Sequence, residues 1–164
     1  MKMMEKLKAK KKDNKGFSLV ELIIVIAIMA ILVGIVGTQV VPYIERSRKA
    51  KDIQQISGFC TDAMTAYSSN ASKLDATETY TITINTTGVT ATDSTGATSS
   101  DLLSSFTELN SITKIGTGTN ELKFESKSGK AITAITIICK NGKPMISLDV
   151  TGPSDAADFH VESN

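Results

Sequence analysis

Residues that commonly carry catalysis or bind metals are scarce in this sequence. Its 164 residues include no tryptophan, one histidine and two cysteines. The histidine, His160, has no cysteine or histidine neighbour at metal-site spacing. A catalytic triad motif, a P-loop and a dinucleotide fingerprint are also missing. We therefore predict that the chain is not an enzyme and needs no cofactor or metal.

Aromatic residues make up 5% of the chain and are scattered along it. The basic residues are unevenly placed, because seven lysines stand in the first fifteen residues against only Glu5 and Asp13. Nucleic-acid-binding proteins usually place aromatic side chains among the basic ones. The basic block therefore indicates membrane topology, and we predict no nucleic-acid binding by the isolated subunit.

Charge is absent from Leu22 to Ile44. About 20 such residues, at a rise of about 1.5 Å each, cross the roughly 30 Å hydrocarbon layer as a helix. The preceding lysines place residues 1–16 in the cytoplasm and the chain after about Ile44 outside. A secretory signal peptide has a shorter apolar region followed by a cut site. Composition alone therefore favours a single-pass membrane anchor.

Residues 15–35 read KGFSLVELIIVIAIMAILVGI. A basic leader ends at Gly16, Phe17 follows, and a lone acid, Glu21, stands inside the apolar run. This order resembles the class III signal peptide of type IV pilins and pseudopilins. The resemblance implies that a prepilin peptidase cuts between Gly16 and Phe17 and that the new amino group of Phe17 is methylated. It also implies three parts: a cleaved leader at 1–16, a transmembrane and filament-core helix at 17–44, and an extracytoplasmic head at 45–164.

Glu21 has two interpretations. A carboxylate inside an apolar helix is unfavourable in a membrane and calls for a compensating partner. The resemblance implies that this partner is the amino group of Phe17 on a neighbouring subunit. Ser18 and Glu21 also form an S-x-x-E capping box at the start of the helix. Both roles can hold at different stages, and in this context we favour assembly.

The chain after the apolar run predicts an α+β head. Apolar residues at spacings of three and four continue the helix to Tyr67 as an amphipathic segment, although Pro42 favours a kink. Basic residues just outside the bilayer are expected to be solvated, to contact lipid headgroups, or to form inter-subunit ion pairs with Glu45 or Asp52. The segment from Ser68 to Ser100 is expected to lie mostly on the surface.

The head is expected to contain a short helix and a sheet. Ser100 is a candidate N-cap for a helix near Asp101–Leu109. Alternating patterns predict an antiparallel sheet of about 3–4 strands that packs on the amphipathic half of the long helix. The candidate strands are Thr79–Ile84, Glu121–Ser126, Ala131–Lys140 and Pro144–Val150, the last two joined by Asn141-Gly142.

Cys60 and Cys139 both fall on predicted core faces. A disulfide between them and a pair of buried free thiols are both open. The acidic tail, with Asp155, Asp158 and Glu162, is either a solvated end or a calcium loop. We favour the solvated end, because a linear sequence does not show that carboxylates converge.

The leading functional hypothesis is a structural subunit of a type IV pilus that supports adhesion, surface motility, aggregation or DNA uptake. The resemblance implies a prepilin peptidase, other pilin subunits, a platform protein and a motor ATPase as partners. It also implies a single-pass membrane protein that becomes part of an extracellular fibre. The alternatives are a pseudopilin of a secretion or competence system and a membrane-anchored binding domain that never polymerises.

Overall fold

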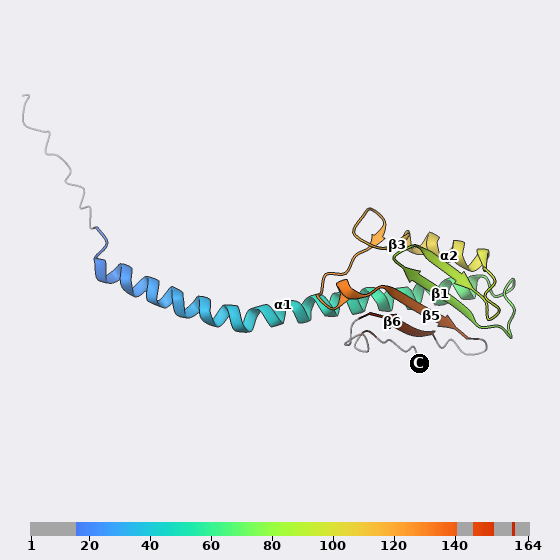
Figure 1. Ribbon diagram of the computed structural model, residues 1–164, viewed down its shortest axis with the longest axis horizontal. Helices are drawn as coiled ribbons and strands as arrows, with labels where there is room; N and C mark the ends of the chain where they lie inside the picture. The colour runs from blue at the N-terminus through green and yellow to red at the C-terminus, as the bar shows by residue number, and fades with distance from the viewer. Residues whose placement is uncertain (1–15, 141–145, 153–158, 160–164) are drawn as a thin grey trace, which may run out of the picture. The chain divides into compact units, whose positions relative to one another are not determined.

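A computed structural model of the chain describes residues 16–140, 146–152 and 159 (Figure 1). The chain divides into two compact units, residues 1–42 and 43–164. Helix α1 (Leu19–Ser69) supplies the described helix of the first unit and the longest element of the second. The helix assignment runs through Pro42 without interruption, and the kink expected there stays a prediction.

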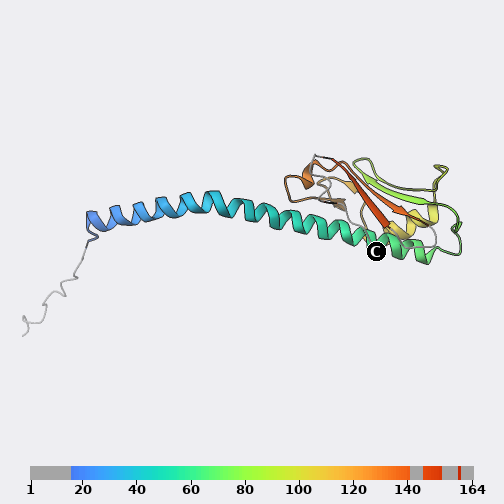
Figure 2. The ribbon, with the colours of Figure 1, turned by 90° about the horizontal axis from the view of Figure 1, so that it is seen from below.

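The second unit is an α+β head, which confirms the predicted fold class. Its main sheet has four antiparallel strands in the order β2-β1-β5-β6. Figures 1 and 2 show this sheet lying along the second half of α1, with α2 at its β2 side. The strands are β1 (Tyr80–Asn85), β2 (Val89–Thr92), β5 (Ala134–Cys139) and β6 (Ile146–Thr151), α2 is Ser100–Asn110, and a small parallel pair consists of β3 (Lys114–Ile115) and β4 (Glu121–Leu122).

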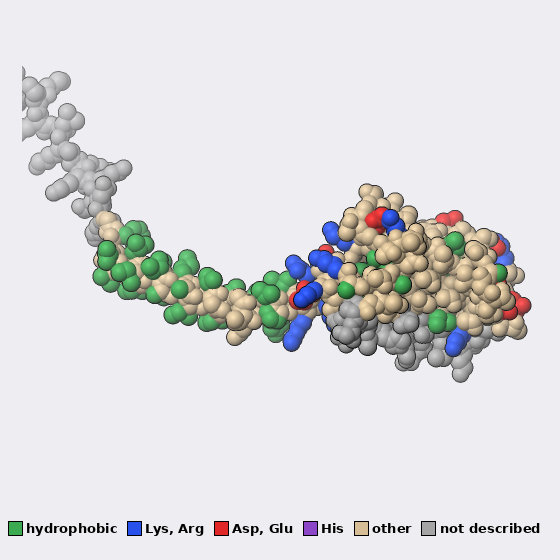
Figure 3. Space-filling model, viewed as in Figure 1, with side chains coloured by type: hydrophobic (Ala, Val, Ile, Leu, Met, Phe, Trp, Pro, Cys, Tyr) green, Lys and Arg blue, Asp and Glu red, His purple; other side chains and the backbone are tan. Residues whose placement is uncertain are grey.

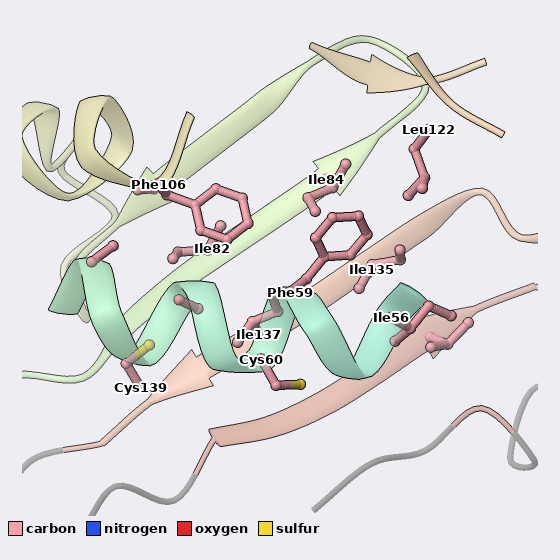
Figure 4. Packing of buried hydrophobic residues seen from close by; sticks show 14 of the residues in the cluster. Ile56, Phe59, Cys60, Ile82, Ile84, Phe106, Leu122, Ile135, Ile137 and Cys139 are labelled. Carbon is pink, nitrogen blue, oxygen red and sulfur yellow. The ribbon is translucent and has the colours of Figure 1, made fainter. Parts of the chain in front are cut away.

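The core of the head forms where the sheet faces α1. Successive side chains of a strand point to opposite faces, so every second residue of β1 and β5 is buried. Figure 4 shows Phe59 of α1 and Phe106 of α2 among these strand residues. Burying such apolar side chains stabilises the fold by about 1.5–3 kcal/mol each. The buried residues of α1 are Asp52, Ile56, Phe59, Cys60, Ala63 and Ala66, and those of the two strands are Tyr80, Ile82, Ile84, Ile135, Ile137 and Cys139.

The prediction that Glu121–Ser126 forms a strand of the main sheet was wrong. Only Glu121 and Leu122 are extended, and they pair with β3 in the separate parallel pair. Phe124 and Ser126 are buried in the loop that follows. Their alternation with exposed residues resembles that of a strand, but Phe124 belongs to the hydrophobic core of the head and Ser126 bonds to Asp52 of α1 instead.

Strand β2, within the Ser68–Ser100 segment, was missed. Its hairpin turn depends on Asn85, whose side-chain oxygen accepts hydrogen bonds from the backbone N–H groups of Thr87 and Gly88. Such an Asx turn replaces backbone pairing at the corner. The start of α2 was also misplaced by one residue, because its N-cap is Ser99.

Asp52 ties the loop before β5 to α1. Its side chain is 1% exposed, and its carboxylate accepts hydrogen bonds from the backbone N–H groups of Glu125 and Ser126, both at 2.9 Å, and from the Ser126 hydroxyl. The Gly129 N–H then donates to the Ser126 hydroxyl at 2.8 Å. A buried carboxylate is tolerated only when its oxygens are satisfied in this way. The inter-subunit ion pair considered for Asp52 is therefore wrong, because both oxygens are used inside the head.

Gly129 is required by this arrangement. A Cβ atom there would stand 2.8 Å from Phe124 Cβ and from Ser126 Oγ, and closer still to Asp52 Oδ2. Gly58, on an exposed part of α1, would meet nothing within 4 Å. The two glycines are therefore a matched pair for substitution.

We predict that Gly129→Ala destabilises the head by about 1–3 kcal/mol, because the added methyl group overpacks the buried loop. Gly58→Ala is expected to stabilise it by up to about 1 kcal/mol through helix propensity. Denaturant unfolding of the full chain in detergent micelles, followed by tyrosine fluorescence, measures both changes. Equal effects from the two substitutions would show that the loop does not pack on Asp52.

Candidate functional site

Three of the predicted site residues, Gly16, Phe17 and Glu21, lie at or just before the start of α1. Gly16 and Phe17 precede the helix in irregular backbone, and Phe17 is 90% exposed. A Cβ atom added to Gly16 would meet nothing within 4 Å. The peptide bond between these two residues is therefore free of neighbouring described groups.

Glu21 caps the helix on which it stands. Its carboxylate accepts a hydrogen bond from the Ser18 backbone N–H at 2.8 Å, while the Ser18 hydroxyl accepts one from the Val20 N–H at 3.4 Å. The capping-box interpretation is thereby confirmed for the single chain. Glu21 forms no ion pair with any described residue. Its assembly role stays a prediction.

The apolar run leaves its side chains uncovered. Large apolar side chains from Phe17 to Ile44 are exposed on all sides of the helix. Their exposed fractions range from 43% to 90%. The Thr38 hydroxyl is satisfied within the helix, because it donates to the Ile35 carbonyl at 3.2 Å. By length and composition, α1 is the one described helix suited to cross a membrane. Such a surface needs lipid or other helices around it.

The comparisons with known proteins agree with this N-terminal geometry. Residues 11–37 match the family model for the prokaryotic N-terminal methylation motif. The chain carries the class III signal of type IV pilin-like proteins. The match contains Gly16, Phe17 and Glu21 and ends within the apolar run. No curated protein and no solved structure matches the chain.

The motif supports a pilin-like protein, either a pilin or a pseudopilin, and it is typical of a structural class of proteins. The apolar helix that it begins is consistent with anchoring in a membrane before assembly. Among residues 16–140, 146–152 and 159, no group of three or more His, Cys, Asp or Glu side chains is placed to hold a metal ion. The calcium loop considered for Asp155, Asp158 and Glu162, and also His160, lie outside the described residues.

Cys60 and Cys139 lie in the same core, as predicted, and both are free thiols in the structure (Figure 4). Burial raises the pKa of Cys139 to about 12, with a further contribution from Cys60. Burial also raises the pKa of Cys60. Both groups are therefore held in the protonated, unreactive form at neutral pH.

We predict that native protein reacts very slowly with iodoacetamide at pH 8, where a thiol with a pKa of about 12 is about one part in ten thousand thiolate. Reactivity should rise as the pH approaches the raised pKa. After unfolding without reductant, mass spectrometry should find two alkyl groups per chain. If alkylation of the unfolded chain requires prior reduction, the cysteines are instead joined by a disulfide.

Sequence reasoning missed Asp52 and Phe59 as core residues of α1. Asp52 lies four residues before Ile56, so the helical spacing of the apolar face already included it. Asp52 was not predicted to be buried, because charged side chains are rarely buried unless they are paired. The burial of such a residue can be recognised only when the position of its hydrogen-bonding loop is known.

Proposed function

We propose that the chain is a structural subunit of a type IV pilus. The observation that carries this proposal is an apolar helix that begins with the methylation motif and leaves its large side chains uncovered. Lipid covers such a helix before assembly, and identical helices cover it in a fibre. Close packing against like helices also keeps this apolar surface away from water when the subunit leaves the membrane.

Cleavage between Gly16 and Phe17 is the first step of the proposed pathway. Gly16 lacks a side chain, which allows a protease cleft to approach the peptide bond closely. Hydrolysis by a prepilin peptidase leaves a carboxylate on Gly16 and an amino group on Phe17, which is then methylated. The lysine-rich leader holds this bond at the cytoplasmic face while the apolar run anchors the chain.

Pairing of Glu21 with the new amino group is the second step. Cleavage creates a cation at Phe17, and apolar surroundings strengthen its attraction to a carboxylate. A Glu21 side chain that bends back to the Ser18 N–H already points toward the helix start. In the fibre, the Phe17 amino group of a neighbouring subunit takes the place of this backbone donor. Docking of a subunit then neutralises a charge that is unfavourable in lipid.

The proposed parts follow from these steps. Residues 1–16 are the cleaved leader, 17–44 the transmembrane and filament-core helix, and 45–164 the extracytoplasmic head. The subunit waits in the membrane with its amino terminus in the cytoplasm, and a platform protein and a motor ATPase assist its assembly. The resulting extracellular fibre serves adhesion, surface motility, aggregation or DNA uptake.

We predict that Gly16→Val blocks cleavage, because a branched side chain next to the bond obstructs its extended fit in the peptidase. Intact mass and amino-terminal analysis of protein from the native host should find methylated Phe17 as the first residue of the parent chain and Met1 in the variant. Ser18→Ala is the control, since it removes the helix cap and leaves the bond intact. A parent chain that still begins at Met1 in a host with active peptidase would support a simple membrane anchor.

We predict that Glu21→Gln is cleaved normally but yields at least about tenfold fewer fibres, because losing one partner of a desolvated ion pair costs about 3–5 kcal/mol. Electron microscopy and the mass of sheared fibres measure this yield. Glu108→Gln, on an exposed part of α2, is the matched control. Full fibre yield from Glu21→Gln would contradict the assembly role, and processed protein that forms no surface fibre in the parent strain would favour a pseudopilin.

A further inference from the structure

Basic side chains gather where the head begins. Beyond Ile44, the first turns of α1 in the head carry Arg46, Arg48, Lys49 and Lys51. The loop before β5 adds Lys123, Lys127 and Lys130, all exposed. Figure 3 shows Lys and Arg side chains clustered over this part of the head. Segments about 75 residues apart in the chain thus contribute to one positive surface.

Part of this surface is hollowed. A cleft of about 770 Å³ lies between α1 and the loop before β5, entirely within the head. Its uncharged lining residues are Gln54, Gln55 and Phe124. The charged residues that line it are Arg48, Lys51, Asp52, Lys123, Glu125 and Lys130. We call it the basic cleft.

The acids of the basic cleft do not neutralise it. Four cations against two carboxylates leave a formal charge of +2 (4 − 2) among the lining residues. Asp52 is 1% exposed, and its carboxylate already accepts hydrogen bonds from the loop backbone and the Ser126 hydroxyl. Glu125 approaches Lys51 at 3.6 Å. Lys123 and Lys130 form no ion pair with any described residue.

The place of the basic cleft along α1 indicates which anion it meets. Arg48 and Lys51 follow Ile44, the last residue of the uncharged run, by four and seven residues, or about 6 and 10 Å of helix axis. The headgroup layer on each side of the hydrocarbon is about 5–7 Å deep. Lipid phosphates are therefore the abundant anions beside Arg48, at the end of the cleft nearest the uncharged run, while the subunit is in the membrane. Guanidinium and ammonium groups both bind phosphate.

We propose that the basic cleft binds the phosphate headgroup of an anionic phospholipid in the outer leaflet of the membrane. This inference rests on the membrane stage of the proposed function, but not on cleavage or fibre formation. Lys123 and Lys130 are the specific part of the site, because they bring charge from a distant loop to the lipid beside α1.

Native mass spectrometry of the full chain in neutral detergent tests this site. Phosphatidylglycerol and phosphatidylcholine are titrated in turn, and the lipid retained per chain is counted. The parent chain should retain phosphatidylglycerol about tenfold better than K123Q/K130Q, since each lysine near such a surface contributes measurably to binding. K73Q/K140Q removes the same charge from exposed positions that do not line the cleft and should retain as much lipid as the parent.

The leader lysines are the same in every variant, so the difference between the two double variants reports the cleft. Equal loss in both would overturn the proposal in favour of diffuse charge attraction. Displacement of the lipid by millimolar inorganic phosphate would identify a free-phosphate site and overturn it as well. Binding of a second copy of the chain, in place of lipid, would identify the cleft as a subunit interface and would also overturn the proposal. Failure of cleavage or of fibre formation leaves this measurement unchanged, so the two proposals fail separately.

Discussion

The uncovered apolar surface of α1 from Phe17 to Ile44 is the constraint on which the rest of the molecule depends. Water does not tolerate a helix with large apolar side chains on every side, so lipid or other helices must surround it. The backbone polar groups are hydrogen-bonded inside the helix, and the Thr38 hydroxyl bonds to the same helix. The helix can therefore lie in lipid or among other helices. The helix therefore suits a subunit that moves from a membrane to a fibre core, and the methylation motif at its start fits that passage.

Glu21 and Asp52 are carboxylates on the same helix that differ in burial and in the number of hydrogen bonds they accept. Asp52 is buried in the head, where two backbone N–H groups and a hydroxyl from the loop before β5 satisfy it. Glu21 accepts a single backbone N–H at the helix start and is exposed. A carboxylate that is exposed and has one neutral donor retains capacity for a cation. Asp52 accordingly fixes the loop before β5 on α1, and Glu21 retains the capacity that its proposed pairing with a neighbouring subunit requires.

Several local patterns were sufficient, although the turn at Asn85 and the N-cap at Ser99 are also local and were missed. The capping box at Ser18, the apolar run, and the alternation that buries Ile82 and Ile137 were all readable, since each depends on spacing within one element. Contacts between distant segments were not readable. Phe124 and Ser126 alternate as a strand would, but Ser126 is bonded to Asp52, about 70 residues earlier in the chain, and Phe124 packs in the core of the head. The basic cleft was hidden for the same reason, because Arg48 and Lys130 meet only after the loop has been placed.

Helical reconstruction of fibres sheared from the native host tests the central claim most directly. The account predicts that residues 17–44 form the fibre core, with the Phe17 amino group of one subunit within ion-pair distance, about 4 Å, of Glu21 on its neighbour. Fibres that contain this chain but leave the apolar helix outside the core would contradict the account. A core in which Glu21 meets only apolar side chains would likewise contradict the charge pairing on which docking is proposed to depend.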